Sequence, residues 1–281
     1  MKINPDSLRI YKTRAHKLLR VFHNLYEHRS LIRILTMRDF RARYIGSLGG
    51  GLWALAQPLF MVLVYTMVFS RFLGVKFGVS DSPFAFAVFL LCALLPWNAF
   101  AESFSTATNL IRANSHLVKK AIFPVEVLPV NLILVTMITQ VIGTVILIPL
   151  VFMVNNHLFW TLLFVPIIMI LQFLFYTGIV FFWTGFSVFL PDLRQITIVL
   201  ISALPFLAPI FYPLESIPKR YLFLINLNPF THLVTMYRDV IMQGKLPSWQ
   251  QLLGFAIFSL LVFIIGYGWF QLYKREFADI L

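Results

Sequence analysis

The chain has 281 residues, of which 59% are hydrophobic and only 12% are charged, and its mean hydropathy is +0.83. A soluble globular domain carries about 25% charged residues, so this composition predicts an integral membrane protein. It excludes a disordered chain, a secreted disulfide scaffold and a soluble enzyme. The single cysteine, Cys92, lies in an apolar run. The formal net charge of +12 indicates basic cytosolic flanks rather than binding to nucleic acid.

The first 51 residues are polar and basic, and the first apolar run begins at Leu52. No cleavable signal sequence is visible, so we expect the N-terminus to be retained. Leu8 to Tyr26 would place apolar residues on one side of a helix and basic residues on the other. This helix is expected to lie among lipid headgroups; the alternative is a helix that packs on a soluble partner. The chain thus divides into a cytosolic basic amphipathic segment, 1–51, and a membrane domain, 52–281.

Six later stretches are apolar over the roughly 20 residues that a helix needs to cross a bilayer. The predicted fold is therefore all-α, with six transmembrane helices. The third and fourth stretches exceed the minimum and are expected to tilt or to project beyond the lipid. The stretches are Leu52 to Leu73, Phe84 to Thr108, Val125 to Val154, Phe159 to Leu190, Ile196 to Tyr212 and Gln250 to Tyr273.

Basic residues predict the orientation, because Lys and Arg are enriched in cytosolic loops. With the N-terminus inside, 17 of the 23 Lys and Arg residues fall on the cytosolic side. Both termini and the loop 109–120 are then cytosolic, and the segment 213–249 is external.

The external segment 213–249 is too polar to span the membrane and too apolar for a plain loop. Asn228 followed by Pro229 predicts a helix start, and Gly244 a helix end, so we expect a helix from Pro229 to Gln243. With the residues before it, this helix is predicted to form a re-entrant hairpin in the outer leaflet. The alternative is a seventh span, which would invert the C-terminus.

The sequence offers little catalytic chemistry. The one Gly-Lys pair, Gly244-Lys245, is followed by Leu246 and so makes no phosphate-binding loop. The six histidines lack metal-ligand spacing, and no metal site is predicted. Glu102 is the one carboxylate well inside a predicted span, and we expect it to make a helix-end hydrogen bond or to pair with a cytosolic base. Ion coupling is therefore poorly supported, and the energy for any transport must come from another chain.

Three motifs occur in this layout. Arg38 to Tyr44, followed by Trp53 and Pro58, leads into the first span. After the second span, a lysine-rich stretch with Lys119 and Lys120 runs into Phe123, Pro124, Glu126 and Pro129; around the fifth span stand Asp192, Arg194, Pro213, Ile217, Pro218, Asn228 and Pro229. In order and spacing, this set resembles the permeases of ABC polysaccharide exporters, the family that includes O-antigen, capsule and teichoic-acid exporters.

The resemblance implies a half-transporter. Two copies of the chain would associate with two copies of a separate ATP-binding cassette subunit and export a lipid-linked polysaccharide through the inner membrane. ATP and Mg would be bound by that subunit, so no cofactor is expected in this chain. The family's interfacial helix is best matched by Leu31 to Tyr44, which leaves the Leu8 to Tyr26 helix as an extension. A Gram-negative envelope is preferred, and a Gram-positive envelope with teichoic acid stays open.

The cytosolic loop 109–120 is predicted to dock the ATPase, because a force on it would move the second and third spans together. Positive-inside anchoring explains its charges but not the apolar residues beside them. The proposed docking residues are Asn109, Leu110, Ile111, Arg112, Leu117, Val118, Lys119 and Lys120.

Before the first span, Arg38, Arg41 and Arg43, with Asp39 and Tyr44, lie where a lipid pyrophosphate would lie. Arginine recognises such oxyanions bidentately. Anchoring of the chain at the headgroups explains the same arginines equally well.

Aromatic residues make up 16% of the chain and suggest a glycan-conducting channel, although Phe facing lipid and Trp and Tyr at the interfaces are ordinary in membranes. The candidates are Trp53, Phe60, Phe86, Trp97 and Phe211. The outer gate is predicted at Pro213, Ile217, Pro218, Asn228 and Pro229. The alternatives are an ABC exporter of teichoic acid or of a small lipid or drug, an ATP-independent flippase or channel, and, less supported, a membrane enzyme.

Overall fold

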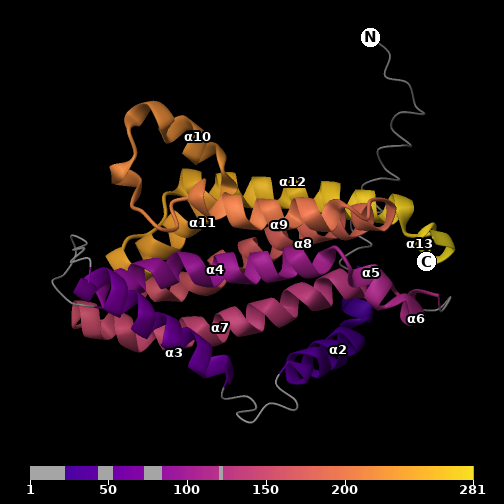
Figure 1. The fold of residues 1–281 in the computed structure, drawn as a ribbon, viewed down its shortest axis with the longest axis horizontal. Helices are drawn as coiled ribbons and strands as arrows, with labels where there is room; N and C mark the ends of the chain where they lie inside the picture. Colours follow the sequence, from indigo (N-terminus) through magenta and orange to yellow (C-terminus); the bar gives the residue numbers. More distant parts are fainter. Residues whose placement is uncertain (1–22, 44–52, 73–83, 120–122, 281) are drawn as a thin grey trace.

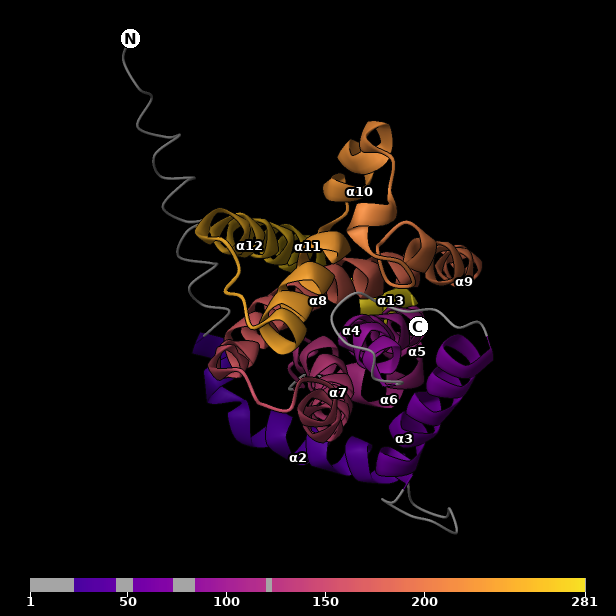
Figure 2. The same cartoon turned by 90° about the vertical axis from the view of Figure 1, so that its left-hand side faces the viewer.

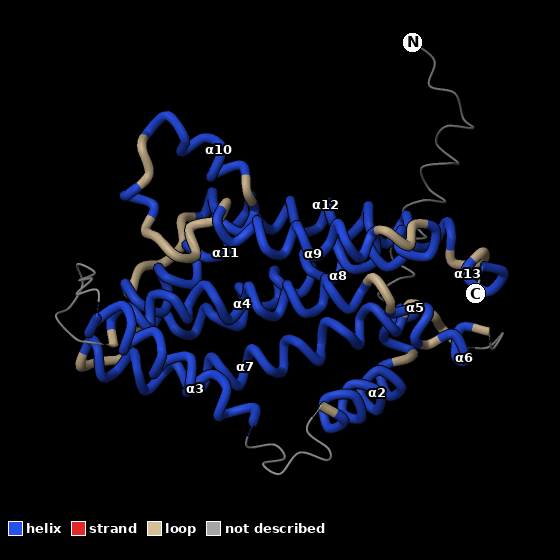
Figure 3. The backbone as a smooth tube through the Cα atoms, in the orientation of Figure 1, coloured by secondary structure: helices blue, strands red, loops and turns tan. Residues whose placement is uncertain are grey.

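The computed structural model describes residues 23–43, 53–72, 84–119 and 123–280, and the regular elements within these ranges are all helical (Figures 1 and 3). The long helices run along the longest axis of the molecule (Figure 1). Within the described residues, four helices are long and apolar enough to cross a membrane: α4 (Ala85–Ala107), α7 (Val127–Asn155), α8 (Val165–Phe189) with the 3₁₀ turn Trp160–Phe164 before it, and α12 (Trp249–Tyr273). They match four of the six predicted spans.

The other two predicted spans are shorter helices. α3 (Trp53–Tyr65) continues as a π-helix, Thr66–Phe72, and α9 (Leu193–Ala203) continues as a 3₁₀ turn, Leu204–Phe206. The fifth span was expected to reach Tyr212, but helical structure ends at Phe206. Pro209, which has no backbone N–H, follows directly in an irregular segment.

The strongest packing within the bundle is between α8 and α12, where two glycines meet. A side chain at Gly266 would overlap the carbonyl oxygen of Gly178, and one at Gly178 would come within 2.6 Å of the Phe263 backbone. Small residues allow helix backbones to approach this closely, which is the usual means of packing in membranes. Aromatic rings complete the contact, since the Phe181 ring lies edge-on to Tyr267 and Phe270.

A helix before the first predicted span, α2 (Arg29–Ala42), lies across α7 on the outside of the bundle (Figures 1 and 2). Its buried residues Ile32, Leu35 and Thr36 face inward. α2 coincides with the stretch that the family resemblance assigned to an interfacial helix. Of the amphipathic helix expected from Leu8 to Tyr26, the part up to position 22 lies outside the described residues.

Two single-turn helices, α5 (Leu110–Ala113) and α6 (Ser115–Val118), follow α4 at one end of the bundle. The short α13 (Phe277–Ile280) lies at the same end and contacts α6 (Figure 1).

The segment before α12 consists of the 3₁₀ turns Leu214–Ser216 and Lys219–Tyr221, α10 (Leu222–Leu227), α11 (Pro229–Arg238) and the π-helix Asp239–Gln243. The expected helix from Pro229 to Gln243 is confirmed, although its last turn is π-helical. Asn228 caps it by accepting a hydrogen bond from the Phe230 N–H (3.0 Å), and Gly244 ends it with a φ of 64°. α11 packs inside the bundle, whereas α10 projects away from it (Figures 1 and 2).

Candidate functional site

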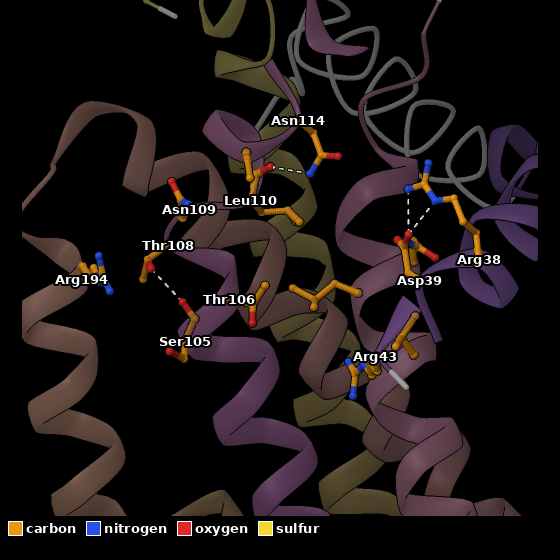
Figure 4. A pocket seen from close by; sticks show the side chains of 14 residues that line it. Arg38, Asp39, Arg43, Ser105, Thr106, Thr108, Asn109, Leu110, Asn114 and Arg194 are labelled. Atoms are coloured by element: carbon orange, nitrogen blue, oxygen red, sulfur yellow. Dashed lines mark hydrogen bonds and ion pairs between the residues drawn. The ribbon is translucent and has the colours of Figure 1, made fainter. Parts of the chain in front are cut away.

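A cavity of about 540 Å³ opens where α2, α4, α7 and α9 come together near α5. Figure 4 shows Arg194 on one side of it and Arg38, Asp39 and Arg43 on the other. Hydroxyl and amide groups supply most of the remaining polar lining. The polar residues around the cavity are Arg38, Asp39, Arg43, Ser105, Thr106, Thr108, Asn109, Asn114, Asn131 and Arg194. Such a lining suits a ligand with many anionic oxygens, because arginine donates paired hydrogen bonds to them.

Two of the three arginines pair with carboxylates. Arg38 contacts Asp39 Oδ1 through Nε and Nη2, both at 2.7 Å. Arg43 Nη2 lies 2.7 Å from Glu102 Oε1, which links the end of α2 to α4. The pairing expected of Glu102 with a basic residue is therefore found. The lining of the cavity therefore carries three arginines and one carboxylate, and Glu102 pairs with Arg43 from outside the lining. These partly exposed ion pairs are weak enough to exchange with a bound anion.

A polar seam joins α2 to α7 directly behind this cavity. The buried Asn131 accepts from the Thr36 hydroxyl at 2.8 Å and donates to Asp39 Oδ2 at 2.6 Å. Arg43 Nη1 also reaches the Thr139 hydroxyl, at 3.4 Å. Buried amides and hydroxyls are costly unless paired, so the seam holds α2 in one register and orients Asp39 toward Arg38.

The structure changes the set of residues predicted for the anion site. Arg38, Asp39 and Arg43 line the cavity, but Arg41 is exposed and is not part of the lining, and Tyr44 lies outside the described residues. Arg194 joins from α9, far along the chain. Arg194 was noted in the sequence as part of the motif around the fifth span, but no pattern in the sequence indicates that it faces the same cavity as Arg38.

The predicted docking loop 109–120 is folded more tightly than expected. Ile111 is 1% exposed and Val118 6%, and Leu110 is also buried, so these apolar residues pack within the chain. Leu117 is half-buried, Asn109 lines the cavity, and Lys120 lies outside the described residues. The interpretation of Leu110, Ile111 and Val118 as docking residues is therefore corrected, whereas the docking role of the loop itself stays a prediction. The exposed residues of the loop include Arg112, His116 and Lys119.

The motif residue Glu126 connects the start of α7 to the end of α12. Its Oε1 accepts from Lys274 Nζ at 2.5 Å and from Gln271 Nε2 at 2.7 Å. Burial raises the pKa of the Glu126 carboxyl, but the hydrogen bonds and the positive charge of Lys274 outweigh burial and leave the pKa below its ordinary value. This motif position is thus structural, an ionic tie between two long helices.

The other motif residues lie close to helix starts. Phe123 and Pro124 are half-buried before α7, and Pro129 is buried in its first turn, where a missing N–H costs no helical hydrogen bond. Asp192 is exposed just before α9.

The predicted outer gate has two parts: a fixed limb, α11, and an exposed limb, the residues 214–227 before it. Arg238, 6% exposed, donates to the carbonyl oxygens of Pro209 (2.5 Å) and Ile210 (2.8 Å), and its guanidinium lies 3.5 Å from the centre of the Phe89 ring. At the other end of α11, the Asn228 amide donates to the Leu207 carbonyl at 3.0 Å. The side chains of α11 therefore satisfy the irregular backbone after α9, which explains how such a backbone persists inside a bundle.

Outside the contacts made by Arg238 and Asn228, the exposed limb of the gate packs little against the rest of the chain. Pro213 and Ile217 are half-buried, Pro218 is exposed, and α10 contains no buried residue. Asn228 and Pro229, at the start of α11, are half-buried.

A buried amide pair anchors α11 from its other side. Gln140 of α7 and Gln172 of α8 donate to each other at 2.6 and 3.0 Å, and the Tyr237 hydroxyl donates to Gln172 at 2.6 Å. All three side chains are at most 2% exposed. Nothing in the sequence indicates this triad, because isolated Gln and Tyr residues in apolar stretches form no recognisable motif.

The five candidate channel aromatics do not gather at one place. Phe86 and Trp97 are buried within the protomer at 3% and 5% exposure, where Trp97 packs on Phe230. Trp53 and Phe60 are exposed on α3, and Phe211 is 37% exposed near the end of α9.

Comparison with known proteins identifies the class. The family described as ABC-2 type transporter matches residues 30–242. The O-antigen export system permease protein RfbA of Klebsiella pneumoniae is 27% identical over 94% of this chain and 99% of its own length, and RfbA of Myxococcus xanthus is 26% identical over 93% and 99%. The polysialic acid transport protein KpsM of Escherichia coli is 26% identical over 84% of this chain and 90% of its own length.

The chain belongs to the ABC-2 type transporter family, since the match covers most of its length. The resemblance to permeases of polysaccharide exporters, based on the three motifs, is confirmed. The chain is a multi-pass membrane protein, and the regular elements of its described residues are all helical.

Proposed function

We propose that this chain is the transmembrane subunit of an ATP-driven exporter that moves a lipid-linked polysaccharide from the cytosolic to the outer face of the membrane. The relatives that span nearly the same length are named as permeases for O-antigen and as a polysialic acid transport protein. The structural observation that supports the proposal is the arginine-lined cavity between α2, α4, α7 and α9. Its three arginines suit the phosphate groups that join a glycan to its lipid.

In this proposal the cavity lies on the cytosolic side of the inner membrane, with both chain termini cytosolic. Arg38, Arg43 and Arg194 would bind the phosphate oxygens, while Asp39 and Glu102 orient two of the arginines when no ligand is bound. Arg194 belongs to α9, whereas Arg38 belongs to α2 and Arg43 caps it, so a ligand that reached both sides of the cavity would connect these helices.

ATP hydrolysis is assigned to a separate subunit. We propose two copies of this chain and two of an ATP-binding cassette subunit, which holds the ATP and Mg. Its docking surface would use Arg112, His116 and Lys119, which are among the exposed residues of the described part of the segment between α4 and α7. Because α5 and α6 are packed onto the chain through Ile111 and Val118, movement of the ATPase would be transmitted to the long helices.

The polysaccharide would pass between the two copies. Trp53, Phe60 and Phe211 remain the channel candidates, because their rings are exposed on the protomer. The outer gate would be the 214–227 limb, which buries little, with α11 as its fixed support.

The first experiment is mass spectrometry of the transporter purified in mild detergent. We expect an ATP-binding subunit at equal stoichiometry, two of each. Lys119→Glu should weaken this association without unfolding the protein, because Lys119 is exposed. Repeated recovery of the permease alone, under conditions that keep ABC complexes intact, would favour an ATP-independent flippase or channel.

The second experiment tests the cavity. Arg194→Gln and Arg38→Gln should each lower export at least tenfold, measured as surface polysaccharide in a strain that depends on this gene. Arg41→Gln is the matched control on the same face of the membrane, because Arg41 is exposed outside the cavity. An equal loss of export in all three variants would show that these arginines act only as headgroup anchors. If a strain that lacks this gene shows no polysaccharide defect but fails to export a small lipid, the small-lipid alternative would be favoured.

A further inference from the structure

The arginine-lined cavity and the segment proposed to dock the ATPase share one wall. α4 ends beside the cavity, and α5, the first helix of the docking segment, begins three residues further on. The lining includes Ser105 and Thr106 of α4, Thr108 and Asn109 after it, and Leu110 of α5 (Figure 4). A ligand in the cavity would therefore touch the helix that continues into the docking segment.

Glu102 lies on the same face of α4, one turn before the lining begins. Residues three and four apart on a helix share a face, which places Glu102 beside Ser105 and Thr106. Glu102 itself is not part of the lining. Its Oε1 lies 2.7 Å from Nη2 of Arg43, the residue that caps the C-terminal end of α2. This ion pair therefore joins α4 to α2 just outside the cavity.

Arg43 belongs to the ion pair and to the cavity at the same time. Its side chain is part of the lining, and its Nη1 also donates to the Thr139 hydroxyl of α7 at 3.4 Å. A phosphate in the cavity would offer the guanidinium two oxygens for a bidentate contact, which is among the strongest that arginine makes. Because the negative charge of Glu102 repels a neighbouring anion, the anion and Glu102 compete for one guanidinium.

The ion pair is weak enough for this exchange. The side chain of Arg43 is 24% exposed and that of Glu102 44%, and pairs of this exposure add little net stability because water competes for both partners. The hydrogen bonds of Asn131 to α2 hold that helix on α7 independently. Opening the ion pair would therefore leave α2 in place and change only its link to α4.

We propose that the Arg43–Glu102 ion pair is a latch that a phosphate-bearing ligand opens. In the empty cavity the latch holds α4 to α2. A bound phosphate draws Arg43 away from Glu102, and the end of α4 becomes free to move together with α5. Glu102 is then a positioning residue that acts through Arg43 and makes the docking segment respond to the ligand. This inference rests on the proposed function, which assigns the ligand to the cavity and the ATPase to the docking segment.

The test measures the binding of farnesyl diphosphate, a short prenyl diphosphate, to the complete exporter with its ATP-binding subunit. Glu102→Gln should tighten binding about threefold, since it removes the competitor for Arg43. Glu102→Asp, a second variant with a shorter side chain, should tighten it less. In the Arg43→Gln background, which should bind the probe more weakly, Glu102→Gln should have no further effect. Without the probe, Glu102→Gln should raise ATP hydrolysis roughly twofold, because its latch is already open.

Glu126→Gln is the matched control, because Glu126 pairs with Lys274 outside the cavity. It should leave the affinity for the probe unchanged. The latch is overturned if Glu102→Gln fails to tighten binding, as a merely structural pair would predict, or if it tightens binding equally in the Arg43→Gln background. It is also overturned if hydrolysis without the probe stays unchanged. Absence of probe binding to the unmodified exporter, or binding that Arg194→Gln does not weaken, would overturn the proposed function and the latch with it.

Discussion

The α8–α12 pair and the α2–α7 pair are both contacts between helices of one chain, but the first is apolar and the second is polar. α8 and α12 meet through Gly178, Gly266 and aromatic rings, with backbones too close for an added side chain. α2 and α7 meet through a chain of amide, hydroxyl and carboxylate groups centred on Asn131.

This difference separates a rigid side of the molecule from an adjustable one. Close packing favours one geometry, because a gap of about 0.5–1 Å already loses about a quarter to a half of the dispersion attraction. The partly exposed ion pairs beside this seam, Arg38 with Asp39 and Arg43 with Glu102, can exchange partners with water or with a bound anion at little cost. The arginine cavity lies on the adjustable side, where a substrate can change which groups are paired.

The largest expected effect comes from opening the rigid contact. Gly266→Ala should destabilise the protein by about 3 kcal/mol, because the new methyl group overlaps the carbonyl of Gly178 and the helices must separate. The midpoint of thermal unfolding in detergent measures this effect.

Gly268→Ala is the control on the same helix. A side chain at Gly268 meets nothing within 4 Å, so alanine should leave stability unchanged or raise it by up to about 1 kcal/mol, as expected for helix propensity. Equal effects of the two substitutions would show that α8 and α12 do not meet through Gly266 in solution.

The sequence predicts the long apolar helices well because their signal is local. Composition and length identify α4, α7, α8 and α12, and Asn228, Pro229 and Gly244 identify α11 with its cap. The predicted end of the fifth span was wrong. Apolar residues continue past Phe206, whereas the backbone around Pro209 has left the helix and its carbonyl groups are bound by Arg238. Local patterns carry no information about such a distant partner.

The candidate site was predictable only in part for the same reason. Arg38, Asp39 and Arg43 form a compact motif, whereas Arg194 and Asn131 reach the cavity through the packing of α9 and α7. In the docking loop, Ile111 and Val118 were interpreted as a surface, since the sequence does not distinguish an apolar residue that binds a partner from one that packs within the chain.

A smaller effect is expected from cutting the adjustable contact. Asn131→Leu removes both hydrogen bonds and leaves the buried Thr36 hydroxyl unpaired, which should cost about 2 kcal/mol. Limited proteolysis should then cleave after arginines of α2 faster, while α8 and α12 stay protected. Asn155→Leu is the control on α7: the buried amide nitrogen of Asn155 has no partner within the described part of the chain, so this change should be neutral or stabilising.

The smallest effect concerns the ionic tie between Glu126 and Lys274, where pH is the variable. The pKa of Glu126 in the folded protein is lowered from 4.5, so the tie stabilises the protein above the pKa of the unfolded chain. That stabilisation is lost as the pH falls through the folded pKa. With Lys274 partly exposed, the effect should be about 1 kcal/mol. The thermal midpoint of the unmodified protein should therefore fall more between pH 7 and pH 4 than that of Glu126→Gln, in which this titration is absent. Parallel pH profiles would show that the tie contributes nothing to the rigidity of the α7 and α12 ends, and would extend the adjustable region to this end of the bundle.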